Sequence, residues 1–169
     1  VTSFENDNGK FKLSEENNGL EYSSGWWNCI EKGDFDGDGD EDYVAGNLGL
    51  NYRYKTSREF PFQVFASDFN EDSRQDLVLA YYEDEILLPV ENLERSILQI
   101  PELGATISSH DQFGEMILKD IYHEPALDKA LNLKVFTFYS SYIENLGNGQ
   151  FALKTLPNQA QISNINDVI

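Results

Sequence analysis

The stretch Asp34-Phe35-Asp36-Gly37-Asp38-Gly39-Asp40-Glu41-Asp42 places carboxylates at loop positions 1, 3, 5 and 9. Four carboxylates in so compact a loop repel one another, and a hard divalent cation among them relieves the repulsion. Gly39 at position 6 lets the chain reverse with a positive φ, and the carbonyl of Asp40 can add a ligand. The spacing therefore predicts a Ca²⁺ site made by Asp34, Asp36, Asp38, Asp40 and Asp42.

An EF-hand does not account for this loop. Its twelfth position is Ala45 instead of the Glu that an EF-hand requires, and Tyr43-Val44-Ala45-Gly46 is typical of a strand. The alternative to a metal site is a solvated acidic turn. Either way, we expect a loop that joins two strands.

The pattern returns 34 residues later in Asp68-Phe69-Asn70-Glu71-Asp72-Ser73-Arg74-Gln75-Asp76. Short apolar stretches precede and follow both copies, so each unit is predicted to be strand, calcium loop, strand. The second copy has three ligand carboxylates instead of four, and Ser73 replaces Gly39, where a positive φ costs about 1 kcal/mol. We therefore predict a second, weaker Ca²⁺ site, with the site residues Asp68, Asn70, Asp72, Arg74 and Asp76.

Hairpins are predicted near both ends of the sequence. Asn-Gly lies between alternating apolar residues in 4–13 and again in 143–153, and this pair favours a tight turn. Residues 164–169 resemble the start of another such unit, so we interpret the sequence as a segment of a longer repeating array. Unpaired strand edges in such a segment would make self-association a further expectation.

Composition narrows the classes of partner. The 169 residues, long enough for one domain, include 30 Asp and Glu against 12 Lys and Arg, a formal charge of −18. So acidic a surface repels nucleic-acid phosphates and anionic lipids. No apolar run reaches the roughly 20 residues of a membrane span, so no membrane insertion is expected. The single cysteine, Cys29, excludes an internal disulfide and is expected to be a small buried side chain.

Residues 25–50, from Gly25-Trp26-Trp27-Asn28 through the acidic loop to Gly46-Asn47-Leu48-Gly49-Leu50, resemble the FG-GAP/VCBS repeats of bacterial envelope proteins and the calcium-binding blades of integrin α-subunits. The 144–151 hairpin and Leu156-Pro157 resemble the cartilage acidic protein/UnbV group of the same superfamily. The resemblance covers most of 1–90 and 135–169. It implies a β-propeller, commonly of about seven four-stranded blades, displayed outside the cytoplasm for adhesion or ligand binding.

Residues 91–134 have a different pattern. Leu93, Ile97 and Ile100 recur at helical spacing, and Ser109-His110-Asp111-Gln112 predicts a helix start ahead of a second apolar series that runs to Ile121. Pro125 predicts a third, short helix. This helical insertion could line a binding face or cover an apolar sheet.

Catalysis has little support in the sequence. Carboxylates held around calcium stay ionised and occupied, whereas glycoside hydrolysis needs two that face a sugar. His110 and His123 belong to no recognisable metal or nucleophile motif and are expected at the surface or at helix ends.

Two other groups of residues are candidate ligand contacts. Trp26 and Trp27 could stack on sugar rings, although at least one is expected in the core, because adjacent strand residues face opposite sides. Residues 52–58 form a basic aromatic stretch that is either a ligand surface or a loop paired with nearby acids. The candidates are Trp26, Trp27, Tyr52, Arg53 and Lys55.

The sequence thus predicts a mainly β chain of partial β-propeller-like blades with calcium loops and an α-helical insertion. The expected organisation is 1–90 as blades with two Ca²⁺ loops, 91–134 as the helical insertion and 135–169 as a continuation of the blade strands. The expected function is non-enzymatic recognition, adhesion or scaffolding, with a protein or glycan ligand, in the bacterial cell envelope or the extracellular space. The alternative is an accessory domain of a glycan-processing enzyme.

Overall fold

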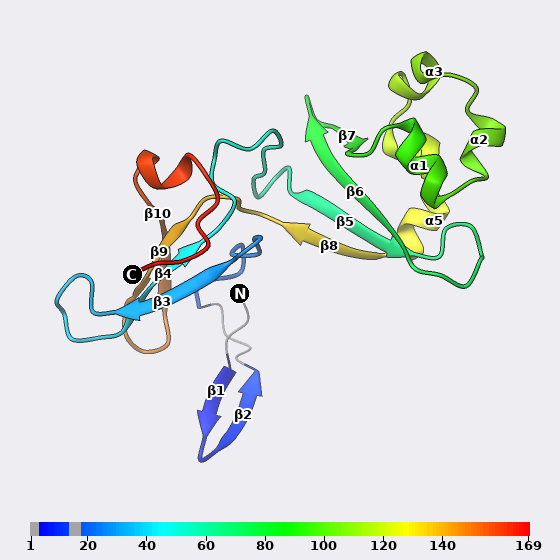
Figure 1. The fold of residues 1–169 in the computed structure, drawn as a ribbon. Coiled ribbons are helices and arrows are strands. Elements are labelled where there is room, and N and C mark those ends of the chain that lie inside the picture. The colour runs from blue at the N-terminus through cyan, green and yellow to red at the C-terminus, as the bar shows by residue number, and fades with distance from the viewer. Residues whose placement is uncertain (1–3, 14–17) are drawn as a thin grey trace. The chain divides into compact units, whose positions relative to one another are not determined.

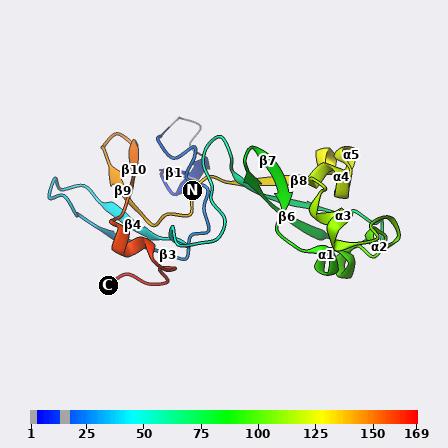
Figure 2. The same ribbon diagram turned by 90° about the horizontal axis from the view of Figure 1, so that it is seen from above.

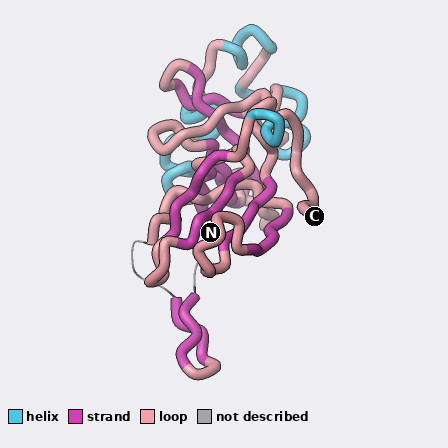
Figure 3. The backbone as a smooth tube through the Cα atoms, turned by 90° about the vertical axis from the view of Figure 1, so that its left-hand side faces the viewer, coloured by secondary structure: helices cyan, strands magenta, loops and turns pink. Residues whose placement is uncertain are grey.

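The chain is mainly β, with ten strands in three sheets among residues 4–13 and 18–169, which are the residues that the computed structural model describes. It folds into two compact units, the first made of Val1–Arg53 with Val135–Ile169 and the second of Tyr54–Lys134. Both units are built on strands, drawn in magenta in Figure 3. Over the described ranges no helix has the length and apolar character needed to cross a bilayer.

The first unit contains a four-stranded antiparallel sheet in the order β3-β4-β9-β10 (Figure 1). Its strands are β3 (Cys29–Gly33), β4 (Asp42–Gly46), β9 (Ser141–Asn145) and β10 (Phe151–Thr155). β3 and β4, and likewise β9 and β10, follow each other in the chain, whereas the second unit is inserted between β4 and β9.

The core of the first unit lies on one face of this sheet. Leu20, Ala45 and Ile143 are buried, and four half-buried side chains pack against them: Trp27, Tyr43, Phe151 and Leu153. Because side chains alternate along a strand, Tyr43 and Ala45 face the core while Val44 faces away. Cys29, which we expected to be buried, is only half-buried, and its Sγ lies 3.7 Å from the Ile165 carbonyl oxygen.

Hydrogen bonds between buried polar groups connect Gly46-Asn47-Leu48-Gly49 and Gln161, near the end of the chain, to the segment 137–140. Asn47 is 0% exposed, and its side-chain amide donates to the carbonyl of Thr137 over 3.1 Å. Gln161, in the short helix η1 (Asn158–Gln161), donates to the Ser140 carbonyl and accepts from the Ser140 N–H. Residues 164–169, expected to start another strand unit, pair with no strand of the described sheets.

The predicted N-terminal hairpin is confirmed. Strands β1 (Phe4–Asp7) and β2 (Lys10–Leu13) pair in register across Asn8 and Gly9, whose φ values are 52° and 86°. Two positive φ values match a type I′ turn, whose twist suits a two-residue hairpin. The hairpin forms a sheet of its own.

The second unit contains a four-stranded sheet in the order β7-β6-β5-β8. Its strands are β5 (Phe62–Ser67), β6 (Asp76–Glu83), β7 (Ile86–Pro89) and β8 (Leu131–Val135). Five short helices gather beside this sheet (Figures 1 and 2), namely α1 (Leu93–Gln99), α2 (Leu103–Thr106), α3 (His110–Gly114), α4 (Leu118–Tyr122) and α5 (Glu124–Lys129).

Helices and sheet share one core in the second unit. Phe65, Val78 and Ala80 from the sheet are buried together with Leu118, Ile121 and other apolar helix residues. Burial of these side chains against the strands, more than helix propensity, stabilises helices of four to seven residues. The boundary that we expected between residues 90 and 91 therefore lies inside a single unit, whereas the one expected after 134 coincides with a unit limit.

The helical segment differs from the prediction in detail. Ser109 caps α3 as expected, since its Oγ accepts from the Gln112 N–H over 3.1 Å, but the Gln112 side chain returns to Ser108 instead of Ser109. The apolar series expected as one helix divides into α3 and α4, with Gly114 ending α3. Pro125 lies in the first turn of α5, as predicted. All three sheets are open over the described ranges, so no closed propeller ring is present there.

Candidate metal site

Two loops of the same length connect paired strands, one in each unit. Residues 34–41 join β3 to β4, and residues 68–75 join β5 to β6. The register is also shared, because Gly33 pairs with Asp42 and Ser67 pairs with Asp76. Position 9 of each loop is therefore the first residue of a strand, opposite the residue that precedes position 1.

The same four hydrogen bonds fold both loops. The N–H of position 2 donates to the carboxylate of position 9, over 3.2 Å in the first loop and 2.9 Å in the second. Position 6 donates to position 1 over 3.2 and 2.8 Å, position 5 to position 3 over 3.2 and 3.3 Å, and position 7 to position 5 over 2.9 and 2.8 Å. Side chains of this spacing thus hold the backbone in a tight coil.

Backbone dihedrals agree between the loops as well. Positions 4 and 6 have positive φ in both: 81° and 97° at Gly37 and Gly39, and 60° and 68° at Glu71 and Ser73. The positive φ expected at position 6 is confirmed, and position 4 is a second such place that the spacing did not indicate. Only the first loop has glycine at both positions.

The first loop brings three carboxylates together. Asp34, Asp36 and Asp42 each offer an oxygen, and these oxygens lie within 4.8 Å of one another. Asp42 is buried at the strand start, whereas Asp34 and Asp36 are exposed. Clustered carboxylate oxygens suit a hard cation, so this triad could hold a metal ion. Asp38 and Asp40 lie outside the triad, and the Asp38 carboxylate accepts from the Asp40 N–H.

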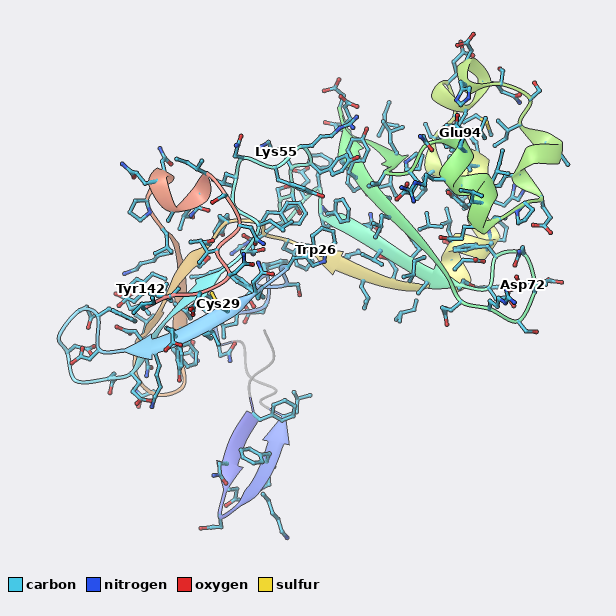
Figure 4. The ribbon with its side chains drawn as sticks, viewed as in Figure 1. Trp26, Cys29, Lys55, Asp72, Glu94 and Tyr142 are labelled. Carbon is cyan, nitrogen blue, oxygen red and sulfur yellow. The ribbon has the colours of Figure 1, made fainter. Side chains whose placement is uncertain are left out.

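A neighbouring strand holds Asp42 in place. The Tyr142 hydroxyl (Figure 4) donates to its Oδ2 over 2.7 Å and the Asn145 N–H to its Oδ1 over 2.9 Å, both from β9. These hydrogen bonds, the tyrosine's first, lower the pKa of Asp42. Loss of water around Asp36, together with the neighbouring carboxylates of Asp38 and Asp42, raises its pKa. Hydrogen bonds thus favour the ionised form of Asp42, while loss of water first and the neighbouring carboxylates second disfavour the ionised form of Asp36.

The two β9 residues could not be found from loop spacing. Tyr142 lies 100 residues after Asp42, and Asn145 lies 103 residues after it. No local signal connects either of them to the loop, because the sheet alone makes β9 the neighbour of β4.

The second loop carries a related but different set of side chains. Asp68, Asn70, Asp72 (labelled in Figure 4) and Asp76 occupy ligand positions 1, 3, 5 and 9. Arg74, at position 7, donates its N–H to Asp72 and has an exposed side chain, so only its carbonyl could be a ligand. Asp76 is buried and accepts from the Phe69 N–H, and its burial raises its pKa despite that bond.

The tryptophans belong to the first unit and help to build it. Trp27 packs against the core, and its indole N–H donates to the Ser23 carbonyl over 2.8 Å. Trp26 (Figure 4) is half-buried, with its ring 5.5 Å from that of Phe138. Both rings therefore have structural contacts in the fold.

The basic aromatic stretch does not form one surface within either unit. Tyr52 and Arg53 are exposed residues of the first unit, and Lys55 (Figure 4) is an exposed residue of the second. The two histidines lie at the surface as expected, His110 beside Glu94 at 3.0 Å and His123 between α4 and α5 with φ of 59°.

Comparison with known proteins adds no further relationship: no family model, no curated protein and no solved structure matches the chain.

Proposed function

We propose that the two loops are Ca²⁺ sites and that the chain is a non-enzymatic calcium-binding domain of an exported bacterial protein, used for recognition, adhesion or scaffolding. The observation that carries the proposal is the pair of loops with one spacing and one set of internal hydrogen bonds, of which the first gathers three carboxylates. The FG-GAP/VCBS resemblance agrees with this role. Outside the cytoplasm calcium is abundant, so even sites of millimolar affinity would fill.

The choice of calcium follows from the donors. All ligand side chains offered by the two loops are carboxylates or an amide, which are oxygen donors, and neither loop contains histidine or cysteine. Such a set favours Ca²⁺ or Mg²⁺ over zinc or copper. A flexible loop of many oxygens suits the variable coordination of Ca²⁺ better than the strict octahedron of Mg²⁺.

Calorimetric titration of the chain with Ca²⁺, repeated with Mg²⁺, tests the proposal directly. We expect two Ca²⁺ ions per chain and weaker Mg²⁺ binding. Asp34→Asn should remove one Ca²⁺ step and Asp68→Asn the other, whereas Asp167→Asn, an exposed acid outside both loops, should remove neither. Titration curves that are flat, or equal in all three variants, would refute the proposal.

The first loop should be the tighter site. It offers four ligand carboxylates to the second loop's three, its two positive-φ positions are glycines, and β9 fixes one of its ligands. Asp38→Ala is therefore expected to weaken the tighter step and Asp72→Ala the weaker one. The reverse order would mean that charge count and turn strain do not rank these sites.

A further inference from the structure

A pocket in the second unit lies at the end of the helix-covered face of its sheet. Its volume is about 610 Å³, within the range of small-molecule sites, and β5, β6, β8, α4 and α5 contribute to its walls. Gln63 and Phe65 are neighbours on this face of β5, and the core covers Phe65 but leaves Gln63 beside the pocket. None of the loop residues 34–42 and 68–76 lines it.

Three side chains form a polar row along the pocket wall. The Gln63 amide nitrogen donates to the Tyr82 hydroxyl oxygen over 3.2 Å, and the Asn132 amide nitrogen donates to the Gln63 amide oxygen over 2.7 Å. Gln63 is only 5% exposed, so its side chain is held in place within the pocket wall. The three residues come from β5, β6 and β8, which are separate strands of one sheet.

The three side chains of the row retain unused hydrogen-bond donors and an unused acceptor. Once these two bonds are made, the Tyr82 O–H and one N–H of each amide remain as donors, and the Asn132 amide oxygen remains as an acceptor. Among the described residues, no other group is hydrogen-bonded to these three side chains. A hydroxyl group donates and accepts at once, so a row of mixed donors and acceptors suits a ligand with several hydroxyls.

The rest of the lining favours a neutral ligand with apolar faces. Ile86, which is exposed, and the half-buried Leu87 offer carbon surface against which the C–H faces of a sugar ring can pack. The charged residues of the lining have both signs, two lysines and three carboxylates, so no strong field selects an anion or a cation: Lys119, Lys134, Glu85, Glu124 and Asp128.

We infer that this pocket binds a short neutral glycan through the polar row of Tyr82, Gln63 and Asn132. The inference rests on the recognition role proposed above, and it names the ligand class and the site. A glycan is favoured because side chains offer the hydrogen bonds of the row, whereas an extended peptide would pair with the backbone of the edge strand β8, and peptide binding is an outcome that the test separates.

The test is a glycan array followed by calorimetry on the whole chain. The array holds neutral mono-, di- and trisaccharides, uronic acids and short peptides, each tested at saturating Ca²⁺ and again in chelator. We expect neutral saccharides to bind and uronic acids and peptides not to. Tyr82→Phe and Asn132→Ala should each weaken the best neutral ligand by about two- to tenfold, the effect of one lost hydrogen bond. Asn132 is exposed on an edge strand, so its substitution leaves the core intact.

Tyr81→Phe is the matched control. Tyr81 is the strand neighbour of Tyr82, faces the opposite side of the sheet and does not line the pocket, so its variant should bind as the parent does. No neutral saccharide bound at millimolar concentration, tighter binding of an acidic sugar or a peptide, or equal affinity in Tyr82→Phe, Asn132→Ala and Tyr81→Phe would each overturn the inference. Calcium titration of the same samples tells its failure apart from failure of the calcium proposal.

Discussion

Ser73 and Glu71 occupy left-handed backbone conformations in which an L-residue with a Cβ is strained. Their φ values of 68° and 60° correspond to those of Gly39 and Gly37 in the first loop. Each non-glycine residue in this region costs on the order of 1 to 2 kcal/mol. The backbone of the second loop is therefore strained at these two positions, whereas the glycines of the first loop adopt the same conformation without strain.

Ser73→Gly should raise the free energy of unfolding, by about 1 kcal/mol or less. Relief of the strain favours the variant, and the larger conformational entropy of glycine in the unfolded chain offsets part of the gain. Urea denaturation measures the change. The control is Gln75→Gly in the same loop, where φ is not positive and glycine should cost roughly 0.5 to 1 kcal/mol. If the two variants lose stability equally, Ser73 is not strained.

The hydrogen bond from the Tyr142 hydroxyl to Asp42 makes the stability of the fold at low pH depend on the ionisation of that carboxylate. Because it lowers the folded-state pKa of Asp42, that carboxylate stabilises the fold above the ordinary unfolded pKa of about 3.9. The contribution disappears as the pH falls through the lower folded value. In Tyr142→Phe the Asp42 pKa should rise, so unfolding in chelator should begin at a higher pH than in the parent.

An acid titration followed by circular dichroism measures this shift. Tyr139→Phe is the control, since Tyr139 is a nearby half-buried tyrosine whose hydroxyl makes no hydrogen bond to Asp42. Identical acid midpoints for Tyr142→Phe and the parent would show that the hydroxyl does not hold the carboxylate.

At the scale of elements, the segment 18–20 lies against the free edge of β10. The Phe151 N–H donates to the Asn18 carbonyl over 2.8 Å, and Leu20 enters the core. Gly19 has φ of 87°, and a Cβ there would lie 1.9 Å from the Phe151 carbonyl oxygen. Only glycine allows so close an approach, which covers an otherwise unpaired strand edge.

Gly19→Ala should destabilise the first unit by about 2 to 4 kcal/mol, the sum of backbone strain and the displacement that the clash demands. Gly9→Ala is a matched comparison, because Gly9 has nearly the same φ, 86°, but no atom within 4 Å of the added Cβ. It should cost only the strain, about 1 kcal/mol, within its own hairpin. Thermal unfolding that ranks the two equally would show that the contact with β10 is unimportant.

Local features of this fold were predictable, and features that depend on distant partners were not. Asn8-Gly9 and the Ser109 cap act within a few residues, so the sequence pattern identifies them. The pairing of β4 with β9 crosses the inserted unit and has no local signal. Likewise, helical spacing over 109–121 could not reveal that packing on the sheet favours two short helices instead of one.

The candidate metal site shows the same difference between local features, which were predictable, and features that depend on distant residues, which were not. Spacing alone placed Asp34, Asp36 and Asp42 together, because a tight loop leaves few other arrangements. Spacing also predicted Asp38 and Asp40 as ligands, but both lie outside the triad, and it gave no sign of the β9 residues that anchor Asp42.

At the scale of the whole molecule, each unit carries one of the two loops. Loop 34–42 joins strands of the first unit, and loop 68–76 joins strands of the second. An ion that binds only the folded loop stabilises the unit that contains it. Calcium should therefore stabilise both units, and chelation should lower the melting temperature by more than an equal change in ionic strength does.

Hydrogen exchange with mass spectrometry should resolve the two contributions. In calcium, Asp34→Asn should reduce protection in β3, β4 and β9 and leave β5 and β6 nearly unchanged, and Asp68→Asn should do the reverse. If either variant loses protection in the strands of both units, or in neither, then the units do not unfold separately or the loops do not bind the ion.

The insertion of residues 54–134 between β4 and β9 also fixes the order in which the two units can be finished during synthesis. Every strand of the second unit has been made by residue 135, whereas the sheet of the first unit waits for β10, which ends at Thr155. Until β9 has been made, β4 lacks one of its two partners in the sheet, so β3 and β4 could pair only with each other. Early folding of the insert would shorten the flexible loop that must close when β9 reaches β4, and so reduce the entropic cost of that closure.

Nascent chains of increasing length, stalled by a force-sensitive arrest peptide, should thus show a first pulling event once the second unit has emerged and a second event after β10. A single event after β10 alone would mean that the two units fold together.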